Sequence, residues 1–172
     1  VWAIPSAVME RVFSGKKLRG ASTLTQQLTK LLFLTPERSI SRKIKEMMTA
    51  IRIEQTYTKK EILEFYMNEV YLSGGNYGFQ AAGKYYFGRP LDSLTIPEYA
   101  VLAGMLQRPE AYRPDRHPKA SKERRNTVLY AMRDAGYISD EEYHQYIETP
   151  IVLAKKEINN DAGLYFYAEI SK

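Results

Sequence analysis

The sequence predicts an all-α fold, and three observations carry this prediction. Helix-start motifs recur along the chain, apolar residues recur at the spacing of a helix, and no stretch before residue 150 alternates apolar and polar residues as a half-buried strand does. The 172 residues are 44% hydrophobic and 26% charged, a composition typical of one globular domain with a sizeable core. We therefore expect about seven to nine helices of ordinary length.

The first two helices are predicted from apolar stripes. The first stripe comprises Leu24, Leu28, Leu31 and Leu32, and the second comprises Ile40, Ile44, Met47, Met48 and Ile51. Residues three and four apart lie on one face of a helix, so each stripe is expected to face the core. Thr23 and Gln26 form a weak version of the Ser/Thr-x-x-Glu/Gln motif that caps a helix start.

The later helices begin at full capping motifs. These motifs are Thr58–Glu61, Thr95–Glu98 and Ser139–Glu142. Two further apolar stripes comprise Val101, Leu102, Met105 and Leu106, and then Val128, Leu129 and Met132, the latter before a stop at Gly136. Gly, Pro and Asn predict connections at 73–78, 87–90 and 108–118, and residues 150–154 are expected to form a short extended segment.

The net charge is +5, and the first third of the chain carries the positive excess. Residues 1–60 hold 12 Lys/Arg against 4 Asp/Glu, whereas residues 61–172 hold 13 against 16. A basic segment indicates an anionic partner, such as nucleic acid, an acidic membrane surface or a phosphate-bearing substrate, or else an ordinary solvated surface. No run of 18 apolar residues is present. Because the chain starts at Val1 without a methionine, we expect it to begin inside a domain.

The rare residue types exclude several kinds of chemistry. The chain has no cysteine, which rules out disulfide scaffolds, thiolate zinc sites and thiol nucleophiles in these residues. His117 and His144 are the two histidines, and they leave little scope for a histidine-rich metal site or a Ser-His-Asp triad. We assign them no role.

Polar residues concentrate on the first two predicted helices. Arg42, Lys43 and Glu46 share one helical face, roughly opposite the second apolar stripe. Two cations flanking a carboxylate fit an anion site, although a solvent-exposed salt-bridge cluster is the commoner outcome for such a pattern. The preceding helix start, Gly20–Gln27, gathers hydroxyls and amides where free N–H groups suit an anion or a sugar oxygen.

Four motifs in order resemble those of the peptidoglycan glycosyltransferases, glycosyltransferase family 51, found in class A penicillin-binding proteins and monofunctional transglycosylases. The motifs are Gly20-Ala-Ser-Thr-Leu-Thr-Gln-Gln27, Arg42-Lys43-x-x-Glu46, Ile62-Leu63-Glu64-x-Tyr66-Met67-Asn68 with Tyr71-Leu72-x-Gly74, and Arg124-Arg125-Asn126-x-Val128-Leu129. The resemblance covers residues 1–150. Residues 151–172 resemble the linker towards a transpeptidase domain, and no Ser-x-x-Lys acylation motif occurs in the chain.

The resemblance implies a lysozyme-like multi-helix fold with a large lobe and a small membrane-associating lobe. It also implies an enzyme, a hexosyltransferase that polymerises lipid II into β-1,4 glycan strands with inversion and release of undecaprenyl diphosphate. Such enzymes work in cell-wall synthesis at the outer face of the bacterial cytoplasmic membrane, anchored by an upstream helix. Implied partners are lipid II, the growing glycan chain, the membrane surface and a phosphoglycolipid inhibitor of the moenomycin type, with no nucleic acid.

The resemblance assigns roles residue by residue. Glu46 would be a catalytic carboxylate beside the leaving group or a metal. Substrate and diphosphate binding would fall to Lys30, Arg38, Lys43, Arg42, Lys45, Ser22, Thr23, Gln26, Gln27, Arg124 and Arg125. For the two arginines of the last motif, structural roles are favoured over catalytic ones. One would reach the cleft, while the other would pair with a helix terminus or a carboxylate. Tyr66, Asn68 and Tyr71 would be structural. The implied cofactor is a divalent cation, Mg²⁺ or Mn²⁺, in some members, with no organic cofactor.

One family motif does not occur in the chain. It is an acidic Glu-Asp pair with Phe, His and Gly, whose glutamate is the family's general base. Its absence leaves a second hypothesis, a fragment that binds lipid diphosphate or an inhibitor without turnover. A basic helical nucleic-acid binder is a third hypothesis, and it is disfavoured because the aromatic residues of the first 60 positions are not interleaved with the Lys/Arg cluster.

Overall fold

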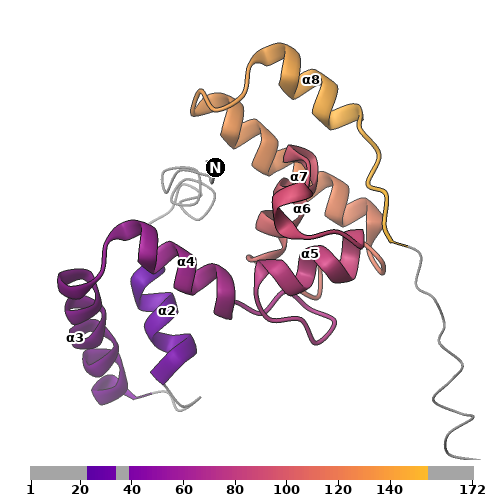
Figure 1. Ribbon diagram of the computed structural model, residues 1–172. Coiled ribbons are helices and arrows are strands. Elements are labelled where there is room, and N and C mark those ends of the chain that lie inside the picture. The colour runs from indigo at the N-terminus through magenta and orange to yellow at the C-terminus, as the bar shows by residue number, and fades with distance from the viewer. Residues whose placement is uncertain (1–22, 34–38, 155–172) are drawn as a thin grey trace, which may run out of the picture.

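The computed structural model describes residues 23–33 and 39–154, and across these residues the chain is helical (Figure 1). The α-helices are α2 (Leu24–Phe33), α3 (Ile40–Thr56), α4 (Lys59–Glu69), α5 (Phe79–Phe87), α6 (Ile96–Met105), α7 (Pro118–Asp134) and α8 (Asp140–Glu148), with a short 3-10 helix, η1 (Leu91–Ser93). Among the described residues, an isolated bridge between Tyr71 and Tyr77 is the one β-type pairing. The all-α prediction is confirmed, and residues 150–154 form no strand.

The predicted helix starts are confirmed. Capping boxes are formed by Thr58 with Glu61, Thr95 with Glu98 and Ser139 with Glu142. The weaker motif of α2 also caps: the Gln26 N–H donates to the Thr23 hydroxyl at 3.2 Å, and the Thr23 N–H donates to the Gln26 side chain at 3.3 Å. At the end of α7, Gly136 adopts φ +76°, the left-handed conformation that stops a helix.

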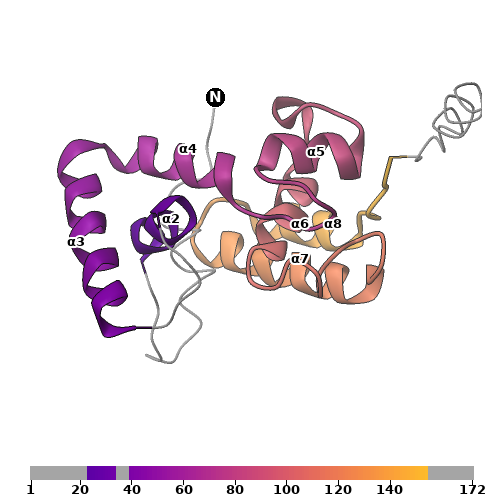
Figure 2. The same cartoon turned by 90° about the horizontal axis from the view of Figure 1, so that it is seen from below.

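The helices form two groups, which we call the small lobe (α2, α3 and α4) and the large lobe (α5 to α8). Both views show this division (Figures 1 and 2), and α4 with α5 is the main helix pair that joins the groups. A continuous core nevertheless passes through the junction, from Leu28 on α2 through Tyr66 on α4 to Leu102 on α6. A second core cluster fills the contact of α6 with α7 and α8.

The apolar stripe of α3 does not face the core, so that prediction is wrong. Its residues are exposed to solvent: Ile40, Ile44, Met47, Met48 and Ile51 retain between 49% and 83% of their accessible surface. The helix instead buries Glu46 and Ala50. The physical reason is that a periodic pattern shows which residues share a helix face but not whether that face packs on the core or is exposed to solvent. Here α3 packs through the small Ala50, which allows close approach, and through Glu46, whose charge is compensated by Arg42 and Lys43.

The apolar stripe of α2 is buried in its first half and exposed in its second half. Leu28 is fully buried and Leu24 packs against the core, as predicted. Leu31 and Leu32 are 45% and 42% exposed, contrary to the prediction. The last turn of α2 therefore adds to the exposed apolar surface of the small lobe.

Candidate functional site

Helices α2 and α3 pack against each other and are joined by a polar contact. The Thr25 hydroxyl, at the start of α2, donates to Glu54 Oε1 near the end of α3 at 2.6 Å. Thr29, fully buried, donates back to the Thr25 carbonyl at 2.9 Å. The Thr25–Glu54 contact therefore ties the start of α2 to the last turns of α3.

Glu46 is the centre of the candidate site. Its side chain is 3% exposed, its Oε1 pairs with Lys43 Nζ, and its Oε2 lies 3.9 Å from Arg42 Nη1. A buried carboxylate is costly unless cations and hydrogen bonds compensate it, and the two basic side chains supply that compensation. The expected grouping of Arg42, Lys43 and Glu46 is confirmed, whereas the alternative of a fully solvent-exposed cluster does not hold for Glu46.

The start of α3 positions these cations. Ser39 is the N-cap, and its hydroxyl accepts from the Arg42 N–H at 3.1 Å. This cap fixes the first turn, so that Arg42 and Lys43 point back along the face that carries Glu46. The Lys43 side chain is 49% exposed and that of Arg42 is 19% exposed, so both cations remain accessible from outside.

Lys30 on α2 and Lys45 on α3 add exposed positive charge to the two helices of the candidate site. Ser22 and Arg38, also predicted to bind substrate, lie outside the described residues.

The amides of α2 occupy two environments. Gln26 caps its own helix with Thr23, as described above, and both residues lie at the helix start. Gln27 Oε1 accepts from the Tyr66 hydroxyl of α4 at 3.4 Å. Tyr66 is 2% exposed, and burial raises the pKa of its phenol to about 12, so it remains a neutral donor at physiological pH. The predicted structural role of Tyr66 fits this contact.

Arg124 and Arg125 lie in the large lobe and make different contacts. Arg125 is fully buried, and its guanidinium donates to the Ile147 and Thr149 carbonyls at the end of α8. Arg124 is half-buried, donates to the Gly104 carbonyl at 3.3 Å and lies over the Tyr112 ring. Arg125 therefore fits the interpretation of an arginine paired with a helix terminus, and we do not carry it into the proposed binding set.

Asn68 and Tyr71 flank the segment that leaves α4. A Cβ on Gly78 would lie 2.5 Å from the Asn68 carbonyl, so the chain passes close enough there to require glycine, and φ at Gly78 is +80°. The Tyr71 hydroxyl donates to Glu110 Oε1 at 2.8 Å. Both residues thus serve the junction between the lobes, in keeping with the predicted structural role.

A resident metal does not fit the described part of the small lobe. Residues 23–33 and 39–154 contain no group of three His, Asp or Glu side chains placed to hold a metal ion. At Glu46 a single carboxylate faces two cations, a donor set that favours an anion over a divalent cation. Among the same residues, no helix has the length and apolar character needed to cross a bilayer.

Two carboxylates of the structure were not anticipated from the sequence. Glu54 joins α3 to α2 through Thr25, and Glu110 joins the α6–α7 connection to Tyr71. Thr25 and Glu54 are 29 positions apart in the sequence, and Tyr71 and Glu110 are 39 positions apart. No local pattern signals such contacts, because they depend on how the helices pack.

Comparisons with known proteins agree on one family. The family model described as Transglycosylase matches residues 1–133. Penicillin-binding protein 1A of Streptococcus oralis is 48% identical over 86% of this chain, and that of Escherichia coli is 48% identical over 78%. The chain covers 24% and 16% of these two proteins, so it spans no more than about a quarter of their length.

A solved structure gives the same result. The crystal structure of penicillin-binding protein 1A from Haemophilus influenzae is similar with a TM-score of 0.57 and 32% identity, over 90% of this chain and 20% of that one. The fold of the described residues is accordingly lysozyme-like and all-α.

Proposed function

From the premise that this chain belongs to the transglycosylase family, as the transglycosylase domain of a class A penicillin-binding protein, we propose that it polymerises lipid II into β-1,4 glycan strands of peptidoglycan. The 4-hydroxyl of one sugar would attack the anomeric carbon of the other with inversion, and undecaprenyl diphosphate would leave. The proposed location is the outer face of the bacterial cytoplasmic membrane. The observation that carries the proposal is the buried carboxylate of Glu46 between Arg42 and Lys43.

Fixed positive charge is the chemistry that these residues offer. When the glycosidic bond breaks, negative charge accumulates on the departing diphosphate, and preorganised cations stabilise that charge better than water does. Lys43 and Arg42 are held in place by Glu46, while Lys30 on α2 and Lys45 on α3 are exposed on the two helices. We assign the diphosphate to this group, together with Arg38. Sugar or phosphate oxygens would be contacted by Ser22, Thr23, Gln26 and Gln27.

Glu46 acts in this scheme by position and charge. Its carboxylate fixes the two basic side chains in one geometry, so that little reorganisation is needed when the diphosphate forms. The attacking hydroxyl also needs a base, and the family's Glu-Asp motif for that role does not occur in residues 1–172. This observation favours a second function for the chain taken alone, in which it binds lipid diphosphate or a moenomycin-type phosphoglycolipid without turnover.

The exposed apolar stripe supports a membrane contact of the small lobe. Five large apolar side chains of α3 and two of α2 are solvent-exposed, and basic residues of the same two helices, such as Lys30 and Lys45, lie beside them. An apolar surface bordered by lysines suits the interface of a bilayer with anionic headgroups. A lipid-linked substrate would reach the Glu46 cluster from that surface. We therefore propose that the small lobe associates with the membrane through this stripe.

The Glu46→Gln variant tests the catalytic assignment. In the full-length protein that carries this domain, polymerisation of labelled lipid II should fall by at least about a hundredfold, because the isosteric amide no longer fixes the cations. The matched control is Glu123→Gln, an exposed glutamate of α7 in the large lobe, which should polymerise normally. Near-normal glycan synthesis by Glu46→Gln would reject the role of Glu46.

The Met48→Glu variant tests the membrane assignment. Met48 is 56% exposed, so the change should leave the fold intact but weaken sedimentation with vesicles that contain anionic lipids. The control Gln145→Glu adds the same charge on α8, where no vesicle contact is proposed, and should bind like the parent. Equal vesicle binding by the Met48→Glu variant and the parent would contradict the membrane role of the stripe.

A further inference from the structure

The two lobes meet at a narrow junction formed by residues 70–78. This segment leaves α4 of the small lobe and enters α5 of the large lobe, and the two views show it crossing between the helix groups (Figures 1 and 2). The core passes through the same place, because Val70 and Leu72 are buried there. The conformation of this segment therefore sets how one lobe is oriented against the other.

The junction is a turn with an unusual backbone. Ser73, Gly74, Gly75 and Gly78 all have positive φ, from +62° to +80°, and Ser73 is a non-glycine residue in that strained region. The turn is closed by hydrogen bonds from the Asn76 side chain to the Ser73 and Gly74 carbonyls, at 3.0 and 3.2 Å. A strained non-glycine residue persists only where its surroundings hold it in place.

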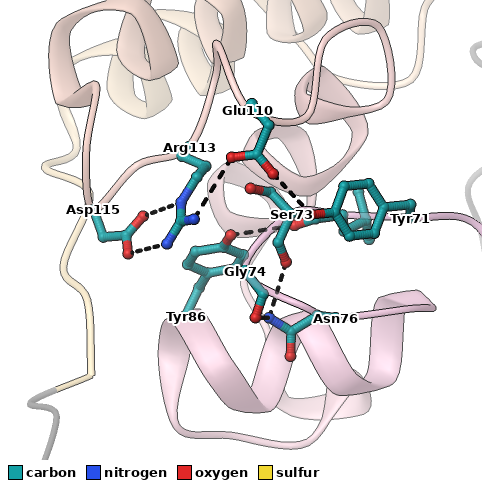
Figure 3. Close-up of polar contacts among 9 residues, drawn as sticks. Tyr71, Ser73, Gly74, Asn76, Tyr86, Glu110, Arg113 and Asp115 are labelled. Atoms are coloured by element: carbon teal, nitrogen blue, oxygen red, sulfur yellow. Dashed lines mark hydrogen bonds and ion pairs between the residues drawn. The ribbon is translucent and has the colours of Figure 1, made fainter.

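Residues of the α6–α7 connection contact the start of this segment, beside the turn (Figure 3). The Tyr71 hydroxyl donates to Glu110 Oε1 at 2.8 Å, and Arg113 Nη1 lies 3.6 Å from Glu110 Oε2. Arg113 is in turn fixed by Asp115 through two hydrogen bonds of 2.9 and 2.8 Å. The α6–α7 connection is thereby hydrogen-bonded to Tyr71, near the start of the junction and directly after α4 ends.

The charges of this group favour the contact at neutral pH. The hydroxyls of Ser73 and Tyr71 and the Arg113 guanidinium face the Glu110 carboxyl and lower its pKa. The hydrogen bond to Glu110 raises the pKa of Tyr71, so the phenol keeps its proton for donation. Glu110 is thus an ionised acceptor for a neutral donor, a charge-assisted hydrogen bond at an exposed position.

We propose that the Tyr71–Glu110 hydrogen bond is a strut that fixes the orientation of the small lobe, and with it the Glu46 cluster, against the large lobe. Glu110, Tyr71 and Arg113 are then positioning residues for the transfer reaction, although the hydrogen bond itself lies in the junction and not at the Glu46 cluster. The kinetic part of this inference rests on the proposed function. The orientation itself does not, so the two can be tested separately.

A distance between the lobes provides the direct test. Residues 1–172 contain no cysteine, so once any cysteine elsewhere in the full-length protein is replaced by serine, cysteines introduced at Gln55 on α3 and Gln145 on α8 place one spin label on each lobe. The distance distribution from pulsed electron resonance should broaden or shift in Tyr71→Phe and in Glu110→Ala. Glu110→Gln keeps an acceptor oxygen and should stay closer to the parent distribution.

The matched control removes a hydroxyl from the same turn. Tyr77 is 64% exposed, and its ring packs at a tilt against that of Tyr71 with centroids 5.1 Å apart, so Tyr77→Phe perturbs the same place without breaking the strut. It should keep the parent distribution. Because Glu110→Ala could weaken the fold, the nearly isosteric Tyr71→Phe decides the matter, and an unchanged distribution in Tyr71→Phe would overturn the proposal.

Kinetics then separate positioning from a merely structural role. Pyrophosphate binding to the small lobe should stay within about twofold in Tyr71→Phe, while kcat for glycan synthesis falls about tenfold, because misalignment of bound groups slows the reaction step. Combining Tyr71→Phe with Glu110→Gln should cost no more than the worse single change. A changed lobe distance with unchanged kcat would also reject the positioning role. If the unaltered protein makes no glycan, the proposed function fails, and the distance measurement still decides on the strut.

Discussion

Arg125→Met removes the arginine that anchors the end of α8. The Arg125 side chain is fully buried, with Nη1 and Nη2 directed at the Thr149 and Ile147 carbonyls and Nε bonded to the Asn126 side chain at 3.0 Å. Burial lowers the pKa of Arg125, which reflects the cost of holding its charge inside. Methionine fills a similar volume but donates no hydrogen bond.

The expected loss follows from the carbonyls left behind. A buried polar group without its partner costs about 1–3 kcal/mol, and this substitution strands two carbonyls together with the Asn126 amide oxygen. The loss of the buried charge itself offsets part of this cost, since desolvation is no longer needed. We expect the free energy of unfolding to fall by about 3 kcal/mol, a large part of the 5–15 kcal/mol typical of a domain.

Equilibrium unfolding in urea, followed by far-ultraviolet circular dichroism, measures this loss. The control is Arg116→Met, at an exposed position of the α6–α7 connection, which should stay within about 0.5 kcal/mol of the parent. A loss below about 1 kcal/mol in Arg125→Met would refute the reasoning. Weaker pyrophosphate binding by a variant that remains fully folded would point instead to a substrate-binding role for Arg125.

Three further perturbations have definite expected outcomes. Lys43→Ala should weaken pyrophosphate binding about tenfold at low salt and make the remaining binding less sensitive to salt, as measured by calorimetry, and unchanged affinity would count against the diphosphate assignment. Gly78→Ala should lower the free energy of unfolding in urea by at least about 2 kcal/mol, because its Cβ would meet the Asn68 carbonyl at 2.5 Å with φ at +80°, and a neutral effect would contradict the close approach. The pKa of Glu110 in the folded protein lies below its ordinary value of 4.5, so its contribution to stability is complete above that pH and is lost as the pH falls through the folded pKa. Below about pH 4.5, thermal melts should therefore show a smaller loss of stability for Glu110→Gln than for the parent, and parallel acid curves would argue against the Tyr71 and Arg113 contacts of Glu110.

The sequence was sufficient for the helix starts and for the local charge cluster. A capping box needs only residues three positions apart, and Thr58 with Glu61 forms one as the pattern predicts. Arg42, Lys43 and Glu46 likewise lie within two helical turns, so helix geometry alone brings them together. Such predictions succeed because the interacting groups are neighbours along the chain.

Predictions that depend on packing were less secure. The apolar stripe of α3 is real as a face, but whether that face meets the core or solvent is decided by α2 and α4, which pack on the opposite side. The Tyr71–Glu110 contact joins residues 39 positions apart and leaves no periodic signature. The helix terminus that Arg125 anchors likewise lies more than 20 residues further along the chain.

The inverted orientation of α3 connects the fold to the proposed chemistry. A helix that buries Glu46 and exposes five large apolar residues gains less from burial than the reverse arrangement would, since full burial of such a side chain contributes about 1.5–3 kcal/mol and these residues keep about half or more of their surface exposed. The same arrangement gives two benefits to a transferase with a lipid-linked substrate. The cations flanking Glu46 would be fixed before the proposed diphosphate binds, and the apolar face would be available to the bilayer that holds the proposed substrate. The burial energy that α3 lacks in the folded chain would therefore be gained when its apolar face contacts lipid. Membrane contact and the geometry of the Glu46 cluster would then both follow from the orientation of this one helix.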